Sequence, residues 1–448
     1  MAIYNYEEAF GAWDITSRQM RQAIGDWFAL YYGGTNTVGS DSCQRVAYTV
    51  VSKLVRAVFG EYQASSEEPF PQQLLTELKN TARQAMELSL VGGECYLKPC
   101  PGTAGFFFTL IPRTNVLIFG RDAAGNITDI GTVERSTVGK YYYTLLERRT
   151  VDEKGYLTIH NKLFRSHNNQ HLGVRVPLSV SAEYASLPDV YRYEKPLNSV
   201  GLVRLKTPML NCVDGSHDGV SVYAPAVSLI ANIDENESQI IGEFRRGQSR
   251  IIASRDLLRD DGSGSLDLTD HLFVGLDEDP EQVGITVFSP QLRHASYLER
   301  KQEYLRNVES VIGLKRGMLS DANMDDRTAT EITSSAGDYN LTIIDFQKMW
   351  EKAVQEAMRV CSILGQLYQI PGAQDIPEDA VTINWGNGVL YDEAKVYAEM
   401  KEQVSMGLLQ PERLMGWYYN MPCDTPIQRE KVRKLYMPEI ETEEEEDE

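Results

Sequence analysis

Two acidic clusters are the residues of this sequence most able to do chemistry. The stretch LDEDPE (276–281) and the pair Asp325 and Asp326 bring carboxylates close together along the chain, and hard cations such as Mg²⁺ prefer carboxylate oxygens. One hypothesis is therefore a metal-dependent nuclease or hydrolase. Both clusters fall in predicted loops and no third ligand stands at a fixed spacing, so a solvated acidic surface is the alternative.

Histidines and cysteines show no pattern that supports such chemistry. His167 and His171 have the i, i+4 spacing of a metal pair, but SHNNQH is typical of a solvated turn between strands. The six cysteines contain no CxxC pair, which indicates reduced thiols rather than zinc ligands. The motifs GxxxxGK[ST], HExxH and GxSxG do not occur. We therefore predict no catalytic residue, no metal and no cofactor.

The overall charge argues against a surface built to bind nucleic acid without specificity. The 448 residues carry a formal net charge of -20, whereas such binders usually present basic patches. The first residues, MAIYNYEEAF, lack the apolar region of a signal peptide. No apolar run approaches the ~18 residues that a membrane span requires, so we expect no membrane partner. The reduced thiols suit a cytosolic chain.

One local basic cluster stands out against this acidic background. The stretch EFRRGQSR places Arg245, Arg246 and Arg250 within six positions. These cations could touch phosphate or a partner protein. Equally, they could complement the dipole at the C-terminal end of a helix, and the sequence leaves both readings open.

The spacing of apolar residues divides the chain into helical and β-rich parts. Helical periodicity over the first ninety residues changes at Gly92–Gly93 to short aromatic and β-branched runs, which end near Pro196. The stretches 122–126 (DAAGN) and 152–155 (DEKG) are typical of hairpin turns. A mixed α+β fold with a β-rich insert at about 92–195 is the prediction.

Two helices and a small unit between them follow the insert. Ile230, Ile233, Ile240 and Phe244 predict one apolar face of a helix ending near Gly247. Leu298, Leu305, Val308 and Ile312 predict a second helix. About 45 residues with Gly, Ser and Asp turns separate them, so we expect a helical hairpin with a small mixed domain at its tip.

A polar break and a very long helix come next. The break after Gly313 precedes TATEI, where Thr328 and Glu331 fit a capping box. An apolar stripe from Tyr339 to Leu367 predicts a helix that runs from Thr330 to Gln369, about 60 Å long. It could kink at 334–337 and ends at Pro371–Gly372. A last helical region spans 391–436, and eight of the ten residues in 439–448 are acidic, which predicts a disordered tail.

The order of these elements resembles tailed-bacteriophage portal proteins of the SPP1-like and A118-like group. Four stretches look like successive parts of that family: the entry to the first wing strand, the exit from the first stem helix, the second stem helix with the start of the long helix, and the C-terminal helices. The entry to the wing strand is MELSLVGGECYLKP, and the exit from the first stem helix is EFRRGQSRIIAS. The second stem helix with the start of the long helix is YLRNVESVIGLKRGMLS followed by TATEI, and the C-terminal helices include GLLQPERLMGWYY.

The resemblance implies a portal fold assembled as a ring, commonly of twelve copies. Its expected parts are a helical and β-rich wing, a two-helix stem, a small α/β clip, a tunnel loop, a long wing helix and a helical crown. In this sequence the wing would fall at 1–224, the two stem helices at 225–247 and 291–313, and the clip between them at 248–290. The tunnel loop would fall at 314–329, the long wing helix at 330–370 and the C-terminal wing and crown region at 371–438, before the acidic tail at 439–448.

The function that the resemblance implies is a conduit for double-stranded DNA at one capsid vertex, used in packaging and ejection, without catalysis of its own. Expected partners are further copies of the chain, the DNA, the terminase large subunit, a head-tail adaptor, and the major capsid and scaffolding proteins. The protein would reside in the virion after assembly in the host cytoplasm. The metal-dependent nuclease or hydrolase remains the alternative.

Three sets of residues follow as candidate sites. The tunnel loop, centred on 317–327, would project into the channel, unless it is a solvent-exposed connector on the outside of the ring. Its predicted members are Lys315, Arg316, Gly317, Asn323, Asp325, Asp326 and Arg327. The stem and clip would share Arg245, Arg246 and Arg250, and the clip would face its partners through Arg255, Asp256, Arg259 and Asp260.

Overall fold

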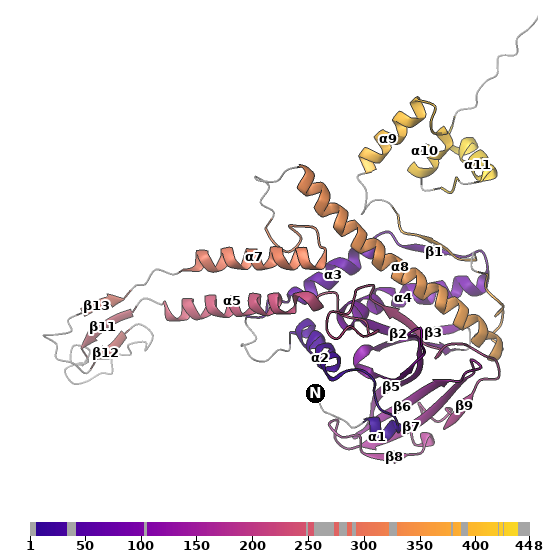
Figure 1. Ribbon diagram of the computed structural model, residues 1–448, viewed down its shortest axis with the longest axis horizontal. Coiled ribbons are helices and arrows are strands. Elements are labelled where there is room, and N and C mark those ends of the chain that lie inside the picture. The colour runs from indigo at the N-terminus through magenta and orange to yellow at the C-terminus, as the bar shows by residue number, and fades with distance from the viewer. Residues whose placement is uncertain are drawn as a thin grey trace, which may run out of the picture. The chain divides into compact units, whose positions relative to one another are not determined.

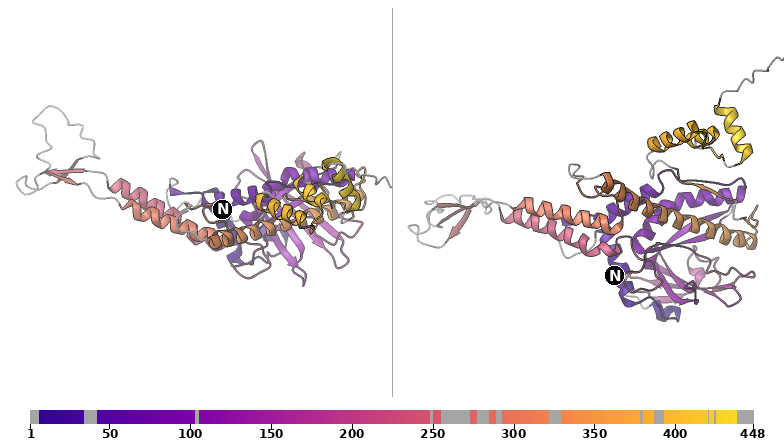
Figure 2. Two further views of the ribbon diagram at one scale, coloured as in Figure 1. Left: turned by 90° about the horizontal axis from the view of Figure 1, so that it is seen from above. Right: turned by 45° about the horizontal axis from the view of Figure 1, so that its top comes forward.

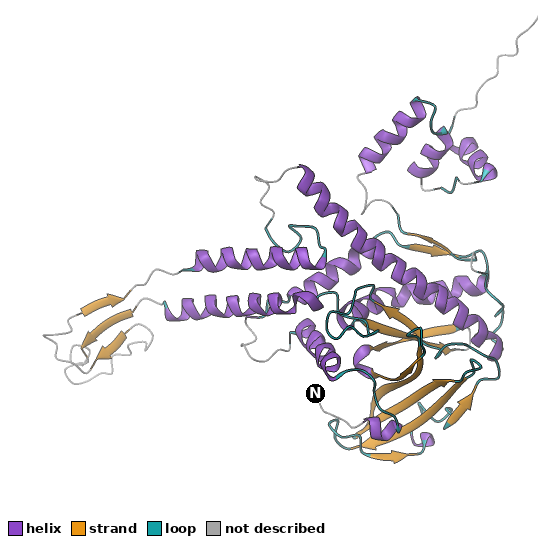
Figure 3. Cartoon of the chain, viewed as in Figure 1, coloured by secondary structure: helices purple, strands orange, loops and turns teal. Residues whose placement is uncertain are grey.

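The computed structural model describes most of the chain as helices joined to small β-sheets (Figures 1 and 3). The described residues are 6–33, 42–102, 105–247, 250–254, 273–276, 285–288, 293–321, 329–377, 380–386, 393–419, 421–423 and 425–437. They separate into two compact units, one comprising residues 1–59 and 64–383, the other residues 60–63 and 384–448.

Four helices of the first unit form its helical core. They are α2 (Arg18–Tyr32), α3 (Val46–Val58), α4 (Pro69–Gly92) and α8 (Ala329–Leu367), and a short α1 (Tyr6–Phe10) precedes them. Ser17 caps α2 by accepting a hydrogen bond from Met20 N at 3.1 Å, and Gly33 ends it in the left-handed conformation. Trp350 of α8 is fully buried and meets the ring of Phe59 edge to face.

The predicted strands appear where the sequence placed them. A six-stranded antiparallel sheet has the order β4-β5-β6-β7-β8, with β9 also paired to β7. Its members are β4 (Val116–Arg121), β5 (Ile127–Val138), β6 (Tyr141–Val151), β7 (Leu157–Ser166), β8 (Val174–Val176) and β9 (Val190–Arg192). The tight turns at Gly125 and Gly155, with φ of 84° and 82°, are the two predicted hairpin turns.

A second sheet extends the β-rich region beyond its predicted end near Pro196. It has the order β10-β2-β3, formed by β2 (Glu94–Pro101), β3 (Phe106–Pro112) and β10 (Val203–Lys206). Helix α4 packs on β2 and β3. At the junction, the backbone of Gly93 touches that of Gly219 so closely that a Cβ on Gly93 would lie 2.2 Å from the carbonyl oxygen of Gly219, so only glycine fits.

The predicted helical hairpin is present as α5 (Val227–Arg246) and α7 (His294–Ile312), which run side by side (Figures 1 and 2). The described residues between them form a mixed three-stranded sheet of order β12-β11-β13, made by β11 (Arg250–Ser254), β12 (Phe273–Leu276) and β13 (Ile285–Phe288). Helix α8 is continuous through 334–337, where the sequence allowed a kink.

Short elements complete the chain. The 3₁₀ turns are η2 (Arg113–Asn115), η3 (Leu178–Val180) and η4 (Ala224–Ala226), and two short strands are β1 (Gln63–Ser65) and β14 (Thr382–Asn384). The second unit contains α9 (Glu393–Ser405), α10 (Pro411–Tyr418) and α11 (Pro426–Tyr436). Thr425 and Gln428 form a capping box at the start of α11. The predicted acidic tail at 439–448 and the predicted cap Thr328 of the long helix lie outside the described residues.

Candidate functional site

The hairpin of α5 and α7 is held in antiparallel register by charged pairs. The end of α5 meets the start of α7, where the Glu243 carboxylate accepts hydrogen bonds from the main chain and guanidinium of Arg293 at 2.8 and 3.2 Å. Two turns further along, Lys301 donates to Glu237 at 2.9 Å. Arg293 is largely exposed, and these bonds lower the pKa of the Glu243 carboxyl.

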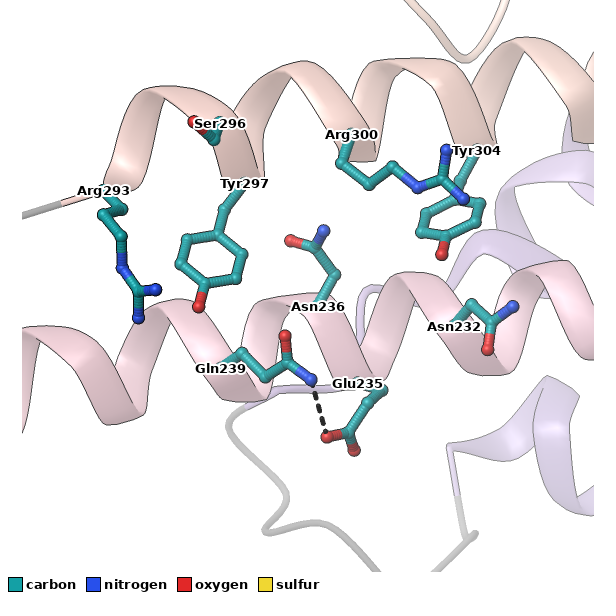
Figure 4. Close-up of a pocket in the computed structure, with 9 residues that line it drawn as sticks. All are labelled: Asn232, Glu235, Asn236, Gln239, Arg293, Ser296, Tyr297, Arg300 and Tyr304. Carbon is teal, nitrogen blue, oxygen red and sulfur yellow. Dashed lines mark hydrogen bonds between the residues drawn. The ribbon is translucent and has the colours of Figure 1, made fainter.

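A polar groove separates the two helices (Figure 4). Tyr297 reaches from α7 toward α5, and Asn236 rises from α5 toward α7. The groove is lined by Asn232, Glu235, Asn236, Gln239, Arg293, Ser296, Tyr297, Arg300 and Tyr304. Asn236 is 6% exposed, and its side-chain oxygen accepts no hydrogen bond. The sequence did not signal this buried amide, which sits on the stripe predicted to be apolar.

Two residues of the predicted apolar faces are not buried. Phe244 and Leu298 are each 50% exposed, although Ile230, Ile233 and Ile240 are buried as expected. Both exposed residues lie at the end of the hairpin where α5 ends and α7 begins. A pair of helices buries a narrower stripe than a helix in a multilayered core, so the prediction of burial was wrong at these positions.

The segment 313–321, which leads from α7 toward α8, contains the described part of the predicted tunnel loop. Gly313 ends α7 with φ 78° and donates its N–H to Glu309 O. Leu314 is buried, whereas Lys315 and Arg316 are exposed. Two cations thus stand together on the surface directly after the helix.

This segment is bonded to α7 rather than free. The carboxylate of Glu309, 1% exposed, accepts hydrogen bonds from Gly317 N at 3.1 Å, from Ser320 N at 2.9 Å and from Ser320 Oγ at 2.8 Å. It also accepts one from Leu319 N. Gly317 adopts a positive φ of 91°, and in this conformation its N–H donates to the carboxylate.

The remaining predicted site residues are only partly visible. Arg245 and Arg246 are exposed in the last turn of α5, the position expected for cations that complement a helix dipole. Arg250 lies in β11, where the structure describes the backbone alone. The other predicted residues lie outside the described part of the chain: Arg255, Asp256, Arg259, Asp260, Asn323, Asp325, Asp326 and Arg327.

A buried cluster of charges, which we call the Glu94 cluster, is a feature that the sequence did not signal. It comprises Glu94, Arg113, Arg204 and Asp218, brought together from β2, η2, β10 and the loop after it. Glu94 is fully buried, bonds to the guanidinium of Arg204 and accepts from Gly219 N at 2.6 Å. Burial opposes its charge, but Arg204 and Arg113 outweigh this effect and lower the pKa of Glu94 to about 2.

A second buried pair lies nearby on β6. The Glu147 carboxylate accepts hydrogen bonds from Lys98 Nζ at 2.8 Å and from Arg149 Nε at 2.6 Å. Arg149 also donates to the main-chain oxygens of Val200 and Gly201. The arginine and lysine outweigh the effect of burial and hold the pKa of Glu147 at about 2. These charges are paired inside the protein and are not available to a ligand.

The described residues offer no set of groups suited to catalysis or metal binding. Within them, no group of three or more His, Cys, Asp or Glu side chains could hold a metal ion. None of the six cysteines, all of which lie in the described residues, forms a disulfide. Burial raises the pKa of the Cys95 thiol to about 12 and also raises that of Cys361, so neither is a reactive thiolate. Across the part of the chain that the structure describes, none of the helices has the length and apolar character needed to cross a membrane.

Comparison with known proteins gives one family. A family model described as phage portal protein, SPP1 Gp6-like, matches residues 130–422, which include both helices of the hairpin, the segment 313–321 and α8. Comparison with curated proteins gave no match.

Two solved structures are similar along nearly their whole length. One is from the neck of a native GTA particle computed with C12 symmetry, with a TM-score of 0.49 and 12% identity over 91% of this chain and 96% of that chain. The other is from the neck of an empty GTA particle computed with C6 symmetry, also with a TM-score of 0.49 and 12% identity, over 93% of this chain and 98% of that chain. Similarity at this level carries no argument about what the chain does.

Proposed function

The chain belongs to the SPP1 Gp6-like family of phage portal proteins, and from this premise we propose that it forms a ring at one capsid vertex through which double-stranded DNA enters and leaves. The family match over residues 130–422 carries the proposal, since it spans the hairpin and the segment after it. The ring is built of copies of this chain alone, and the resemblance to the family implies twelve.

The proposed division of labour follows the elements. The hairpin α5–α7 is the stem that crosses the vertex, and the unit containing β11, β12 and β13 is the clip at its end. The tunnel loop begins in the segment 313–321 and continues to α8. In this arrangement the clip receives the terminase large subunit during packaging and the head-tail adaptor afterwards, and the rest of the ring contacts the major capsid and scaffolding proteins.

The charge distribution supports a channel through which DNA slides without being gripped. The chain has a net charge of -20, and an acidic wall repels phosphates, whereas a few cations at a constriction attract and guide them. Lys315 and Arg316 are exposed next to each other on the segment 313–321. We propose that they and Arg327 face the DNA, and that the protein assembles in the host cytoplasm and remains in the virion.

The ring carries no chemistry of its own in this proposal. Energy for packaging comes from the terminase, and the purified chain is expected to show no ATPase activity that persists after contaminants are removed. This expectation rests on the missing phosphate-binding loop. The carboxylates that a nuclease would use, at 277–281 and at Asp325 and Asp326, lie outside the described residues.

Electron microscopy of the purified protein tests the proposal. Annular particles with a central hole are expected. A monodisperse monomer that cleaves DNA in the presence of Mg²⁺ would overturn it, particularly if an Asp325→Asn, Asp326→Asn double variant lost the cleavage. The matched control is a variant with the same loss of charge at exposed Glu299 and Glu303 on α7.

A further inference from the structure

One carboxylate organises the segment between the stem helix and the predicted channel loop. Glu309 lies in the last turn of α7 and is 1% exposed. Its two oxygens accept bonds from the main-chain N–H groups of Gly317, Leu319 and Ser320, and from the hydroxyl of Ser320. Converging N–H groups of this kind form an anion-binding concavity. Here the anion is supplied by the chain itself.

Two further side chains hold the same stretch from either side. Lys53 of α3 donates its ammonium to the main-chain oxygen of Met318 at 2.5 Å. Gln302, two turns before Glu309 on α7, accepts from Asp321 N at 2.8 Å. Each of the residues 317–321 therefore has a main-chain group bonded to a side chain of α7 or α3. The stretch is fixed to two helices in addition to its own turn, in which Met318 N donates to Lys315 O at 3.1 Å.

These bonds determine where the two exposed cations stand. Leu314 is buried on one side of Lys315 and Arg316, and the bonded stretch begins at Gly317 on the other. The pair therefore lies between two anchored positions, Leu314 and Gly317, with no other residue between them. The end of α7 is also close to α8, because a Cβ on Gly313 would lie 2.7 Å from Thr342 Oγ1.

We propose that Glu309 is a positioning residue that makes 313–321 a rigid extension of α7 and so fixes Lys315 and Arg316 relative to the stem. The inference rests on the proposed function, since it concerns how the ring presents cations to DNA. Movement of α7 is then passed directly to these cations.

Hydrogen exchange of assembled full-length rings tests the bonded geometry without DNA. Glu309→Gln replaces one accepting oxygen with an amide that donates, so N–H groups now meet a donor. Exchange at Gly317, Leu319 and Ser320 should accelerate on the order of ten- to hundred-fold, because hydrogen bonds to charged groups are strong and their loss opens the segment. Glu303→Gln, at an exposed position of the same helix, removes the same charge and should leave exchange unchanged.

The functional part is tested by the DNA content of particles built with the same rings. Glu309→Gln should lower packaged DNA relative to Glu303→Gln, although Lys315 and Arg316 are both intact. Unchanged exchange would overturn the proposed anchoring. Faster exchange with normal packaging would overturn the positioning role. In that case, reduced packaging on removal of the cations themselves would show that the proposed channel function stands and only the role of Glu309 fails.

A second variant covers the case in which Glu309→Gln rings do not assemble. Lys53→Met, on a different helix, removes only the bond to Met318 O and keeps the aliphatic stem. Exchange within 317–321 should accelerate by less than in Glu309→Gln, with α3 itself unaffected. Unaltered exchange across the segment in Lys53→Met rings would contradict the proposal.

Discussion

Arg113 and Arg316 show two opposite uses of the same side chain. Arg113, in the Glu94 cluster, is 3% exposed and donates to Val116 O and Thr16 Oγ1, both at 2.9 Å. Arg316, on the segment 313–321, is exposed. Arg113 lies where a helix, two sheets and a loop meet, and its bonds hold these parts together. Arg316 lies at the surface, directly before the stretch 317–321, whose main-chain groups bond to side chains of α7 and α3.

This difference separates charges that hold the fold from charges that can meet a ligand. A buried ion whose partner is removed remains uncompensated in a medium of low polarity, whereas an exposed cation is already solvated. Glu309 is a charge that holds the fold, because it is buried and hydrogen-bonded. It also supports the charges that can meet a ligand, because it orders the segment that bears Lys315 and Arg316.

The largest effect is expected from Glu94→Gln. Loss of this charge leaves Arg204 and Arg113 facing a neutral amide in the interior, and breaking a buried pair of this kind costs about 3–5 kcal/mol. The free energy of unfolding from urea titration should fall by that amount, or the chain should fail to assemble. Glu299→Gln, at an exposed position, is the control. A loss in Glu94→Gln no greater than in the control would show that the cluster is not structural.

Acid should weaken the same region through Glu147. Its pKa is lowered from 4.5 to about 2 in the folded chain, so the folded state binds the proton less readily than the unfolded one. The resulting stability, on the order of 3 kcal/mol, is complete above the unfolded pKa of 4.5 and is lost as the pH falls through that value toward 2.

Glu147→Gln should therefore destabilise the protein at pH 7, and its difference from the wild type in urea midpoint should shrink as the pH falls from 5 to 3. At each pH the variant is compared with the wild type measured at that same pH. A difference that stayed constant over this range would mean that the lowered pKa of Glu147 does not contribute to stability.

The smallest effect on stability is expected from removing the cations of the predicted channel loop, although the predicted effect on DNA packaging is large. Replacing Lys315, Arg316 and Arg327 with Ala should change the free energy of unfolding by no more than about 0.5 kcal/mol, as is usual for solvated surface charges. Rings should assemble, but the DNA packaged per particle should fall. The matched control replaces Lys140, Lys154 and Arg175, which are exposed on the six-stranded sheet region. Equal packaging by both variants would place the segment outside the channel.

Local periodicity predicted most of the fold. The run YYYTLLERRTV coincides with β6 (Tyr141–Val151), and the stripe on the second hairpin helix predicted α7. Strand β10 was missed because its four residues pair with β2, more than a hundred positions away in the chain. A strand this short carries too little periodicity to be recognised alone.

The candidate site was predictable only in part, because its contacts are long-range. The sequence placed Lys315 and Arg316 after a helix, but it gave no sign that Glu309 would accept bonds from residues eight to eleven positions later. Glu94 likewise meets Arg204 only when β2 and β10 pair. A glutamate on a helix or strand is usually solvated, so burial of these two follows from tertiary structure alone.

The most direct test of the central claim is a reconstruction of the vertex in DNA-filled particles. A ring of this chain is predicted, with density for double-stranded DNA on its axis and with Lys315 and Arg316 of every copy facing that density. A vertex without such a ring, or a ring whose axis is closed to DNA, would contradict the proposed function. A ring that carries DNA but bears Lys315 and Arg316 on its outer surface would contradict the assignment of the channel loop.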